Sequence, residues 1–308
     1  MNRTRRIGIV VLVVLSAAAP ARALIITPLY DSTVTALPYA TQVETAVNYA
    51  IGQFESLYSD PITIKVVVSA AALGDHILGE ASPDLDGPFT YARVRNALIA
   101  GQTTANDATA VASLSATDPT GGTPFYMLRA EAQALRLDTA NSPYVSGTFT
   151  FSTSQNFTFD PANRAVAGEY DFIGTAEHEI SHIMGRFSGL SAPSYLFPFD
   201  LFRYSGPGAR SLTSGNANDY FSIDGGVTSL KVFDNTLDPA DWAANQGADS
   251  FNAYSSSGVV NDLTPVDKTL LDVLGYHLVP EPSSQALFTG GIVLLLTVVR
   301  KRTGRRQR

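Results

Sequence analysis

Residues 170–186 read YDFIGTAEHEISHIMGR and give the clearest indication of how the chain folds. Their apolar side chains recur every three or four positions, which predicts an amphipathic helix over residues 170–185 that ends at Gly185. His178 and His182 are four residues apart and therefore lie on the same face of that helix. The stretch thus predicts a helix that presents two imidazole rings side by side.

Two imidazoles on one helix face can bind a single zinc ion. Glu179 lies one step round the helix, beside the ion rather than on it, where it can take a proton from a zinc-bound water. Zinc lowers the pKa of such a water from about 15.7 to about 7 and polarises a scissile carbonyl. We therefore expect His178 and His182 as zinc ligands, Glu179 as the general base, and a peptide or protein as the substrate.

The rest of the chain shows both helical and strand patterns. Apolar spacing predicts a long helix over residues 38–58, and a β-branched run predicts a buried strand over residues 62–70. Residues 146–160 alternate like a half-buried strand or hairpin. The other expected elements are helices at 90–101, 104–114 and 264–276, a segment at 125–137 whose composition favours helix, and short strands at 219–223 and 229–233.

Residues 172–186 resemble the active-site helix of metzincin-like zinc metalloproteases, in which a glycine three residues after the second histidine turns the chain, as Gly185 would here. The order of predicted elements is similar to that of the clan, with residues 146–160 as an edge strand pair. The resemblance implies an α/β (α+β) fold: a metzincin-like zincin with a mixed twisted sheet, an active-site helix and a Gly-rich lower subdomain. It also implies the activity of a zinc metalloendopeptidase, a hydrolase.

The sequence departs from the metzincin pattern at two places. Ser188 stands where the third zinc ligand is expected, and none of the three methionines lies at the position before the last predicted helix where metzincins carry a Met-turn. A zinc hydrolase needs three protein ligands and one open position, so the third ligand must come from elsewhere. These departures motivate a second hypothesis, a non-catalytic metal-binding protein of the cell surface or exopolysaccharide matrix with a degenerate zincin fold.

Asp200 is the nearest carboxylate after the helix, and we expect it to be the third ligand. It is flanked by aromatic residues and Leu201, so free exposure to solvent is not expected, and the segment from Gly185 to Asp200 is long enough to fold back. A helix cap or an ion pair is the alternative role for Asp200. The alternative ligands are His277, Asp219, Asp224 and Asp262.

Two further groups have candidate roles. Tyr204 and Tyr254 could donate a hydrogen bond to the oxyanion or act as a switching ligand, with a packing role as the alternative for each. The acidic stretches 215–226 and 234–241 could bind calcium through carboxylate and carbonyl oxygens, with solvated loops as the alternative.

The composition limits the remaining possibilities. With 45% hydrophobic and 16% charged residues, the 308-residue chain is too apolar for a disordered protein. The absence of cysteine excludes disulfides, thiolate zinc sites and a cysteine nucleophile. Residues 24–279 carry many more acids than bases, so this part of the chain should repel phosphate backbones, and we expect no nucleic-acid binding.

Both ends of the chain are expected to be targeting signals. Residues 1–23 have a basic start, a short apolar run and a small-residue end, which predicts a secretory signal peptide. Residues 280–308 contain Pro-Glu-Pro, a short apolar stretch and an Arg-rich end, and they closely resemble a PEP-CTERM sorting signal of Gram-negative bacteria.

That resemblance implies export through the inner membrane, transient membrane insertion of the apolar stretch, and removal of the tail by an exosortase-type enzyme. The product would reach the cell surface, the exopolysaccharide matrix or the medium. Residues 24–279 are expected to form the catalytic domain.

Overall fold

The computed structural model of the protein describes residues 23–191, 194–213 and 218–279. The predicted sorting tail, and all of the predicted signal peptide except Ala23, lie outside these residues. No helix in the described part of the chain combines the length and apolar character needed to cross a membrane.

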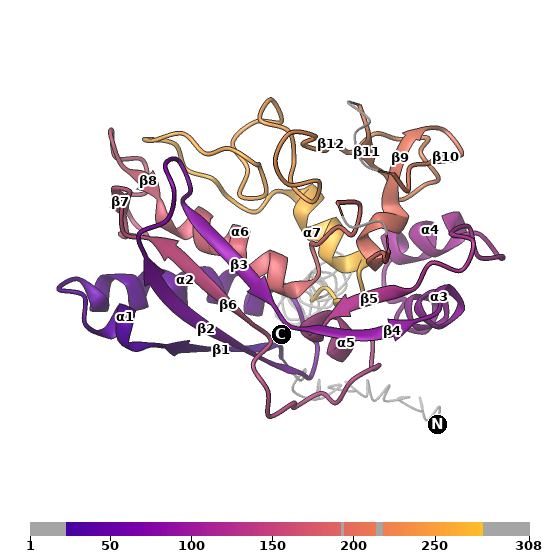
Figure 1. The fold of residues 1–308 in the computed structure, drawn as a ribbon, viewed down its shortest axis with the longest axis horizontal. Coiled ribbons are helices and arrows are strands. Elements are labelled where there is room, and N and C mark those ends of the chain that lie inside the picture. The colour runs from indigo at the N-terminus through magenta and orange to yellow at the C-terminus, as the bar shows by residue number, and fades with distance from the viewer. Residues whose placement is uncertain (1–22, 192–193, 214–217, 280–308) are drawn as a thin grey trace, which may run out of the picture.

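The fold is mixed α and β, as expected, and its main element is a four-stranded mixed sheet. In spatial order the strands are β1 (Ile25–Tyr30), β2 (Thr63–Ala71), β6 (Gly147–Ser152) and β3 (Gly79–Pro83). β1, β2 and β6 are parallel, whereas β3 runs antiparallel to β6 and forms one edge of the sheet. Figure 1 shows the four strands side by side.

The edge of this sheet differs from the prediction. β6 lies in the interior of the sheet and pairs with β2 and β3. The next strand, β7 (Phe157–Thr158), pairs instead with β8 (Tyr170–Asp171). The strand expected within residues 146–160 is therefore confirmed by β6, whereas the expectation of a hairpin or edge strand pair there was wrong, because the two halves of that stretch join different sheets.

The strand predicted over residues 62–70 is β2, which lies between β1 and β6. Its burial alternates, with Ile64, Val66 and Val68 buried and their neighbours half-buried. Because successive side chains of a strand point to opposite faces, one face of the sheet is more deeply packed than the other. β-branched side chains suit such a half-buried pleated surface.

Two helices, α2 (Ala40–Leu57) and α6 (Phe172–Met184), pack against each other on the more deeply buried face of the sheet. α2 contacts β1, and α6 contacts β6 and the edge strand β3. The apolar periodicity correctly predicted the buried face of α2, which comprises Val43, Ala46, Val47, Ala50, Ile51 and Phe54.

An aromatic cluster fixes the start of α6. The ring of Phe172 lies 4.7–6.1 Å, centroid to centroid, from those of Phe149, Phe151, Phe157 and Phe159. Aromatic pairs at these separations stabilise a core beyond the area that they bury. The cluster joins α6 to β6 and so sets the position of the helix over the sheet.

Shorter elements flank the sheet. They are α1 (Ser32–Thr35), β4 (Leu85–Phe89), α3 (Tyr91–Ala100), α4 (Ala105–Ser113), β5 (Phe125–Leu128) and α5 (Arg129–Ala134). The segment expected to be helical over residues 125–137 is therefore divided, because its first four residues pair with β4 as a strand and only the following residues are helical.

After α6 the chain turns at Gly185, whose φ of +135° lies in the region that favours glycine. It then forms a second, smaller part with little regular structure. Its elements are the 3₁₀ helix η1 (Pro198–Phe202), the small sheet of β9 (Arg203–Gly206), β10 (Ala209–Arg210), β11 (Tyr220–Phe221) and β12 (Lys231–Val232), and α7 (Pro265–Val273). Figure 1 shows α6 between this part and the main sheet.

Candidate metal centre

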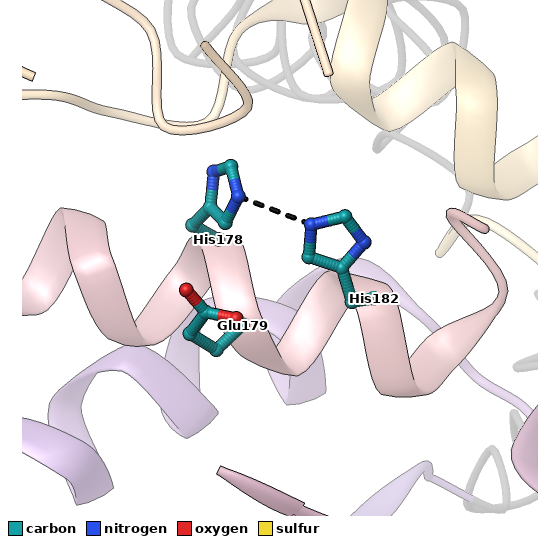
Figure 2. A group of neighbouring side chains, drawn as sticks. All are labelled: His178, Glu179 and His182. Carbon is teal, nitrogen blue, oxygen red and sulfur yellow. Dashed lines mark hydrogen bonds between the residues drawn. The ribbon is translucent and has the colours of Figure 1, made fainter. Parts of the chain in front are cut away.

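The two histidines of α6 face each other, as their spacing predicts. Nε2 of His178 lies 3.1 Å from Nε2 of His182, and Figure 2 shows the two rings projecting from the same side of the helix. Glu179 extends from the adjacent side of the same helix turn, beside the ring pair. The helix therefore delivers both imidazoles to one point.

Backbone carbonyls set the orientation of both rings. Nδ1 of His178 lies 2.8 Å from the carbonyl oxygen of Ser250, and Nδ1 of His182 lies 2.6 Å from that of Arg186. Because a carbonyl can only accept a hydrogen bond, each neutral ring holds its proton on Nδ1. Both Nε2 atoms then present a lone pair to the point between them.

A third acceptor, Asp241, reaches the same point from the loop that follows β12. Its Oδ1 lies 3.4 Å from Nε2 of His178 and 3.3 Å from Nε2 of His182. Three lone-pair atoms thus form a triangle with sides of 3.1, 3.3 and 3.4 Å. Such a cluster of acceptors is favourable when a cation binds between them.

Two other carboxylates lie close to this triangle. Glu179 has a carboxylate oxygen within 4.8 Å of the ligand nitrogens of both histidines, and Asp238 has one within 4.8 Å of His182 and Asp241. The described residues therefore contain a His-Glu-His cluster that could bind a metal ion, with two aspartates beside it.

The charges around the cluster favour metal binding. Burial lowers the pKa of His178 to about 3, which keeps its ring neutral. Burial raises the pKa of Asp241, but its interactions with His178, with the guanidinium of Arg186 and with His182 outweigh this effect and hold that pKa below its usual value. For His182, burial and Arg186 lower the pKa, but contact with Asp241 leaves it raised. A metal ion therefore competes with a proton at His182, and binding should weaken as the pH falls.

Glu179 is a buried carboxyl that packs against the edge strand. Burial raises its pKa to about 7. A Cβ atom added to Gly79 of β3 would lie 2.8 Å from Oε1 of Glu179 and 2.9 Å from its Cγ. The missing side chain at Gly79 thus provides the space in which the Glu179 carboxyl lies.

The cluster lines a cavity of about 870 Å³ between α6, β3 and the loops of the smaller part. His178, Glu179, His182 and Asp241 all contribute to its wall. A cavity of this size admits several residues of an extended peptide or a small organic ligand. The site is therefore both accessible and able to hold a metal ion.

Asp200, the predicted third ligand, is not brought to the histidines. It is buried in η1, where one carboxylate oxygen accepts a 2.6 Å hydrogen bond from Ser188 and the other accepts bonds from the backbone amides of Gly189 and Phe197. The expectation that Asp200 is shielded from solvent is confirmed. However, its oxygens hold the turn after α6 together, and the carboxylate that faces the two histidines is that of Asp241.

The two candidate tyrosines differ in position. Tyr204 is buried in β9 and its hydroxyl accepts a 2.6 Å hydrogen bond from Arg210, outside the cavity wall. Tyr254 lines the cavity with about half of its surface exposed, and its hydroxyl lies 3.4 Å from that of Thr236. Of these two tyrosines, only Tyr254 is therefore placed to approach a ligand in the cavity.

The alternative ligands also have other partners. Nδ1 of His277 lies 2.5 Å from Oδ1 of Asp60, and Oδ1 of Asp262 lies 2.5 Å from a guanidinium nitrogen of Arg164. Asp219 is buried, with a carboxylate oxygen 3.9 Å from Arg203.

The two acidic stretches that could bind calcium contribute differently. Asp224 accepts hydrogen bonds within its own turn, from Ser222 and Thr228. Asp234 does the same, with Thr236 and Leu237 as the donors. In the second stretch, Asp238 and Asp241 form with His182 a group that could hold a metal ion. The sequence indicated that this acidic stretch could bind a cation, but not that it lies beside the two histidines. The adjacent Trp242, which is fully buried, was the available signal that Asp241 packs against the core.

Comparison of the chain with protein-family models, with curated proteins and with solved structures finds no match.

Proposed function

We propose that the protein is a zinc-dependent endopeptidase whose metal ligands are His178, His182 and Asp241. The main support is the triangle of three acceptor atoms, with sides of 3.1–3.4 Å, at the wall of a large cavity. This ligand set replaces the expected one, in which Asp200 was the third member.

Zinc fits this donor set. Donor atoms about 2.0–2.1 Å from a tetrahedral ion lie about 3.3–3.4 Å from one another, close to the separations within the triangle. Two imidazole nitrogens and one carboxylate oxygen are ordinary zinc donors, and three protein ligands leave one position for solvent or substrate. That open position favours a catalytic site over a closed structural one.

A bound zinc ion supplies Lewis acidity, which activates water and polarises a peptide carbonyl. Glu179 then acts as the general base: it accepts a proton from the attacking water and passes it to the leaving nitrogen. Its pKa of about 7 suits both steps, because a group near the working pH can accept and release a proton with little cost.

The substrate binds along the edge strand in this proposal. Residues 79–81 of β3 line the cavity beside Glu179, and β3 is the outermost strand of its sheet. An extended peptide can pair with such an edge through main-chain hydrogen bonds. Pairing there would hold a peptide bond next to the metal site.

Export belongs to the same proposal. The signal peptide, the PEP-CTERM tail and processing by an exosortase-type enzyme remain predictions from residues 1–23 and 280–308. They place the peptidase outside the inner membrane, at the surface, in the matrix or in the medium.

Glu179→Gln tests the function most simply. The purified variant should keep its zinc but cleave casein and a quenched fluorescent peptide library at least 1000-fold more slowly than the unsubstituted protein, since it lacks the base. Glu177→Gln is the matched control, because Glu177 is also a buried acid of α6 but lies outside the cavity wall. If the zinc-loaded, unsubstituted protein cleaves neither substrate, the non-catalytic metal-binding alternative is favoured.

A further inference from the structure

The side chain of Arg186 is fully buried at the end of α6, directly behind the metal centre. Nε donates a 2.8 Å hydrogen bond to the hydroxyl of Ser181, and Nη2 donates a 3.1 Å bond to the carbonyl of His178. These two contacts fasten the guanidinium to the helix that carries the histidines.

The remaining contacts of the same guanidinium reach the loop of the third ligand. Nη1 donates to the carbonyl of Ala240 at 3.1 Å and to Oδ1 of Asp241. The guanidinium carbon also lies 4.5 Å from the ring centre of Phe251, which follows Ser250. One side chain therefore joins the helix to the loop segments that provide both Asp241 and the carbonyl that orients His178.

The oxygen that Arg186 contacts is the same one that faces the histidines. Oδ1 of Asp241 accepts from Nη1 and lies 3.3–3.4 Å from both Nε2 atoms. We propose that Arg186 is the positioning residue of the metal centre: it holds Asp241 on the point where the two imidazoles meet. The inference rests on the proposed metal site, but not on peptidase activity.

Two opposite effects of Arg186 on metal binding are conceivable, and the geometry decides between them. A cation near a metal ion weakens binding by repulsion. However, the guanidinium meets Asp241 by a direct hydrogen bond, and its planar fork binds three other groups at the same time. Without it, the aspartate would keep its charge in a buried position but lose its fixed place, so the loss of positioning outweighs the loss of repulsion.

Zinc affinity, measured by competition with a chromophoric chelator, tests this role. Arg186→Gln should weaken zinc binding by about 10–100-fold, the usual effect of removing a residue that orients a metal ligand. Arg186→Lys keeps the charge but not the fork, so it should recover only part of the loss. Arg164→Gln is the matched control: it removes another buried arginine, paired with Asp171 and Asp262, and should leave zinc affinity within about threefold.

A double mutant separates positioning from general damage to the fold. If Arg186 acts through Asp241, Arg186→Gln should change zinc affinity little in a chain that already carries Asp241→Ala. If Arg186→Gln does not fold, Ser181→Ala removes one anchor of the guanidinium with a small change in volume and should weaken zinc binding about 3–10-fold.

The inference would be overturned if Arg186→Gln bound zinc as tightly as the unsubstituted chain, or more tightly. If Arg186→Gln does not fold, the same result for Ser181→Ala would overturn it. Additive losses in the double mutant would also do so. An unsubstituted chain that binds no zinc would instead remove the proposed function itself, so the two failures are distinguishable in one set of titrations.

Discussion

Oδ1 of Asp241 lies 3.3 Å from Nε2 of His182, although the two residues belong to different parts of the fold. His182 is on α6, which packs on the main sheet, whereas Asp241 lies in the loop region beyond β12. The proposed metal centre therefore forms only when both parts are folded against each other. A ligand of this centre should stabilise the whole domain.

Zinc should raise the thermal stability of the protein. A ligand that binds only the folded state at about 100 times its Kd adds about 2.7 kcal/mol to the free energy of unfolding, which corresponds to roughly 5–10 °C in a domain of this size. Calorimetry of the protein with zinc and with a chelator measures the shift. The same melting temperature in both conditions would argue against a metal site that joins the two parts.

Gly79→Ala should impair catalysis while leaving the metal in place. The new Cβ would lie 2.9 Å from Cγ of Glu179, so the carboxyl must leave its position against β3. We expect peptide cleavage to fall at least tenfold with unchanged zinc content. Gly52→Ala on α2 is the matched control, because a Cβ there meets nothing within 4 Å. Full activity of Gly79→Ala would show that the position of Glu179 does not depend on this gap.

Asp272→Asn should change how stability depends on pH. Asp272 is buried, and burial raises its pKa from 3.8 to about 7. Between these pH values the folded state holds a proton that the unfolded state has released, so the contribution of Asp272 to stability falls as the pH rises through this window. Asparagine can still accept the hydrogen bond from Thr104, and it carries no charge.

The free energy of unfolding of Asp272→Asn, relative to that of the unsubstituted protein, should therefore be about 1–4 kcal/mol higher at pH 8 than at pH 4. Urea unfolding at both pH values measures the difference. Parallel pH curves for the two proteins would mean that Asp272 titrates normally in the fold.

Phe172→Ala should be among the most destabilising single changes. The ring is fully buried among four other phenylalanines at the start of α6. Removing a buried Phe side chain costs about 3–5 kcal/mol, whereas Phe172→Leu should cost less because it leaves a smaller cavity. Urea unfolding of both variants tests this order. A loss below about 1 kcal/mol for Phe172→Ala would mean that the cluster does not hold α6.

Periodic segments were predictable because their pattern is local. The apolar spacing of residues 38–58 and 170–185 indicated α2 and α6 together with their buried faces, and β2 was evident from its β-branched residues. The edge strand β3 was missed, since Gly79–Pro83 reads GEASP and has no β-branched or aromatic residue. Its strand conformation comes from pairing with β6, which no local pattern reports.

The residues of the candidate site also differ in whether local sequence could predict them. His178, Glu179 and His182 occupy one helical turn, so their spacing alone predicted their cluster. The third ligand comes from a distant loop, and only the folded structure brings it close. Asp200 was favoured because apolar neighbours predicted burial, which is correct, but burial does not reveal whether a carboxylate faces a metal or backbone amides.

The most direct test of this account is the zinc affinity of Asp241→Asn beside that of Asp200→Asn, measured in the purified protein. We predict one zinc ion per unsubstituted chain, a loss of affinity of at least 100-fold in Asp241→Asn, and near-normal affinity in Asp200→Asn despite its lower stability. Normal zinc binding by Asp241→Asn would contradict the assignment of the metal centre. So would a result in which a folded Asp200→Asn loses zinc and Asp241→Asn does not.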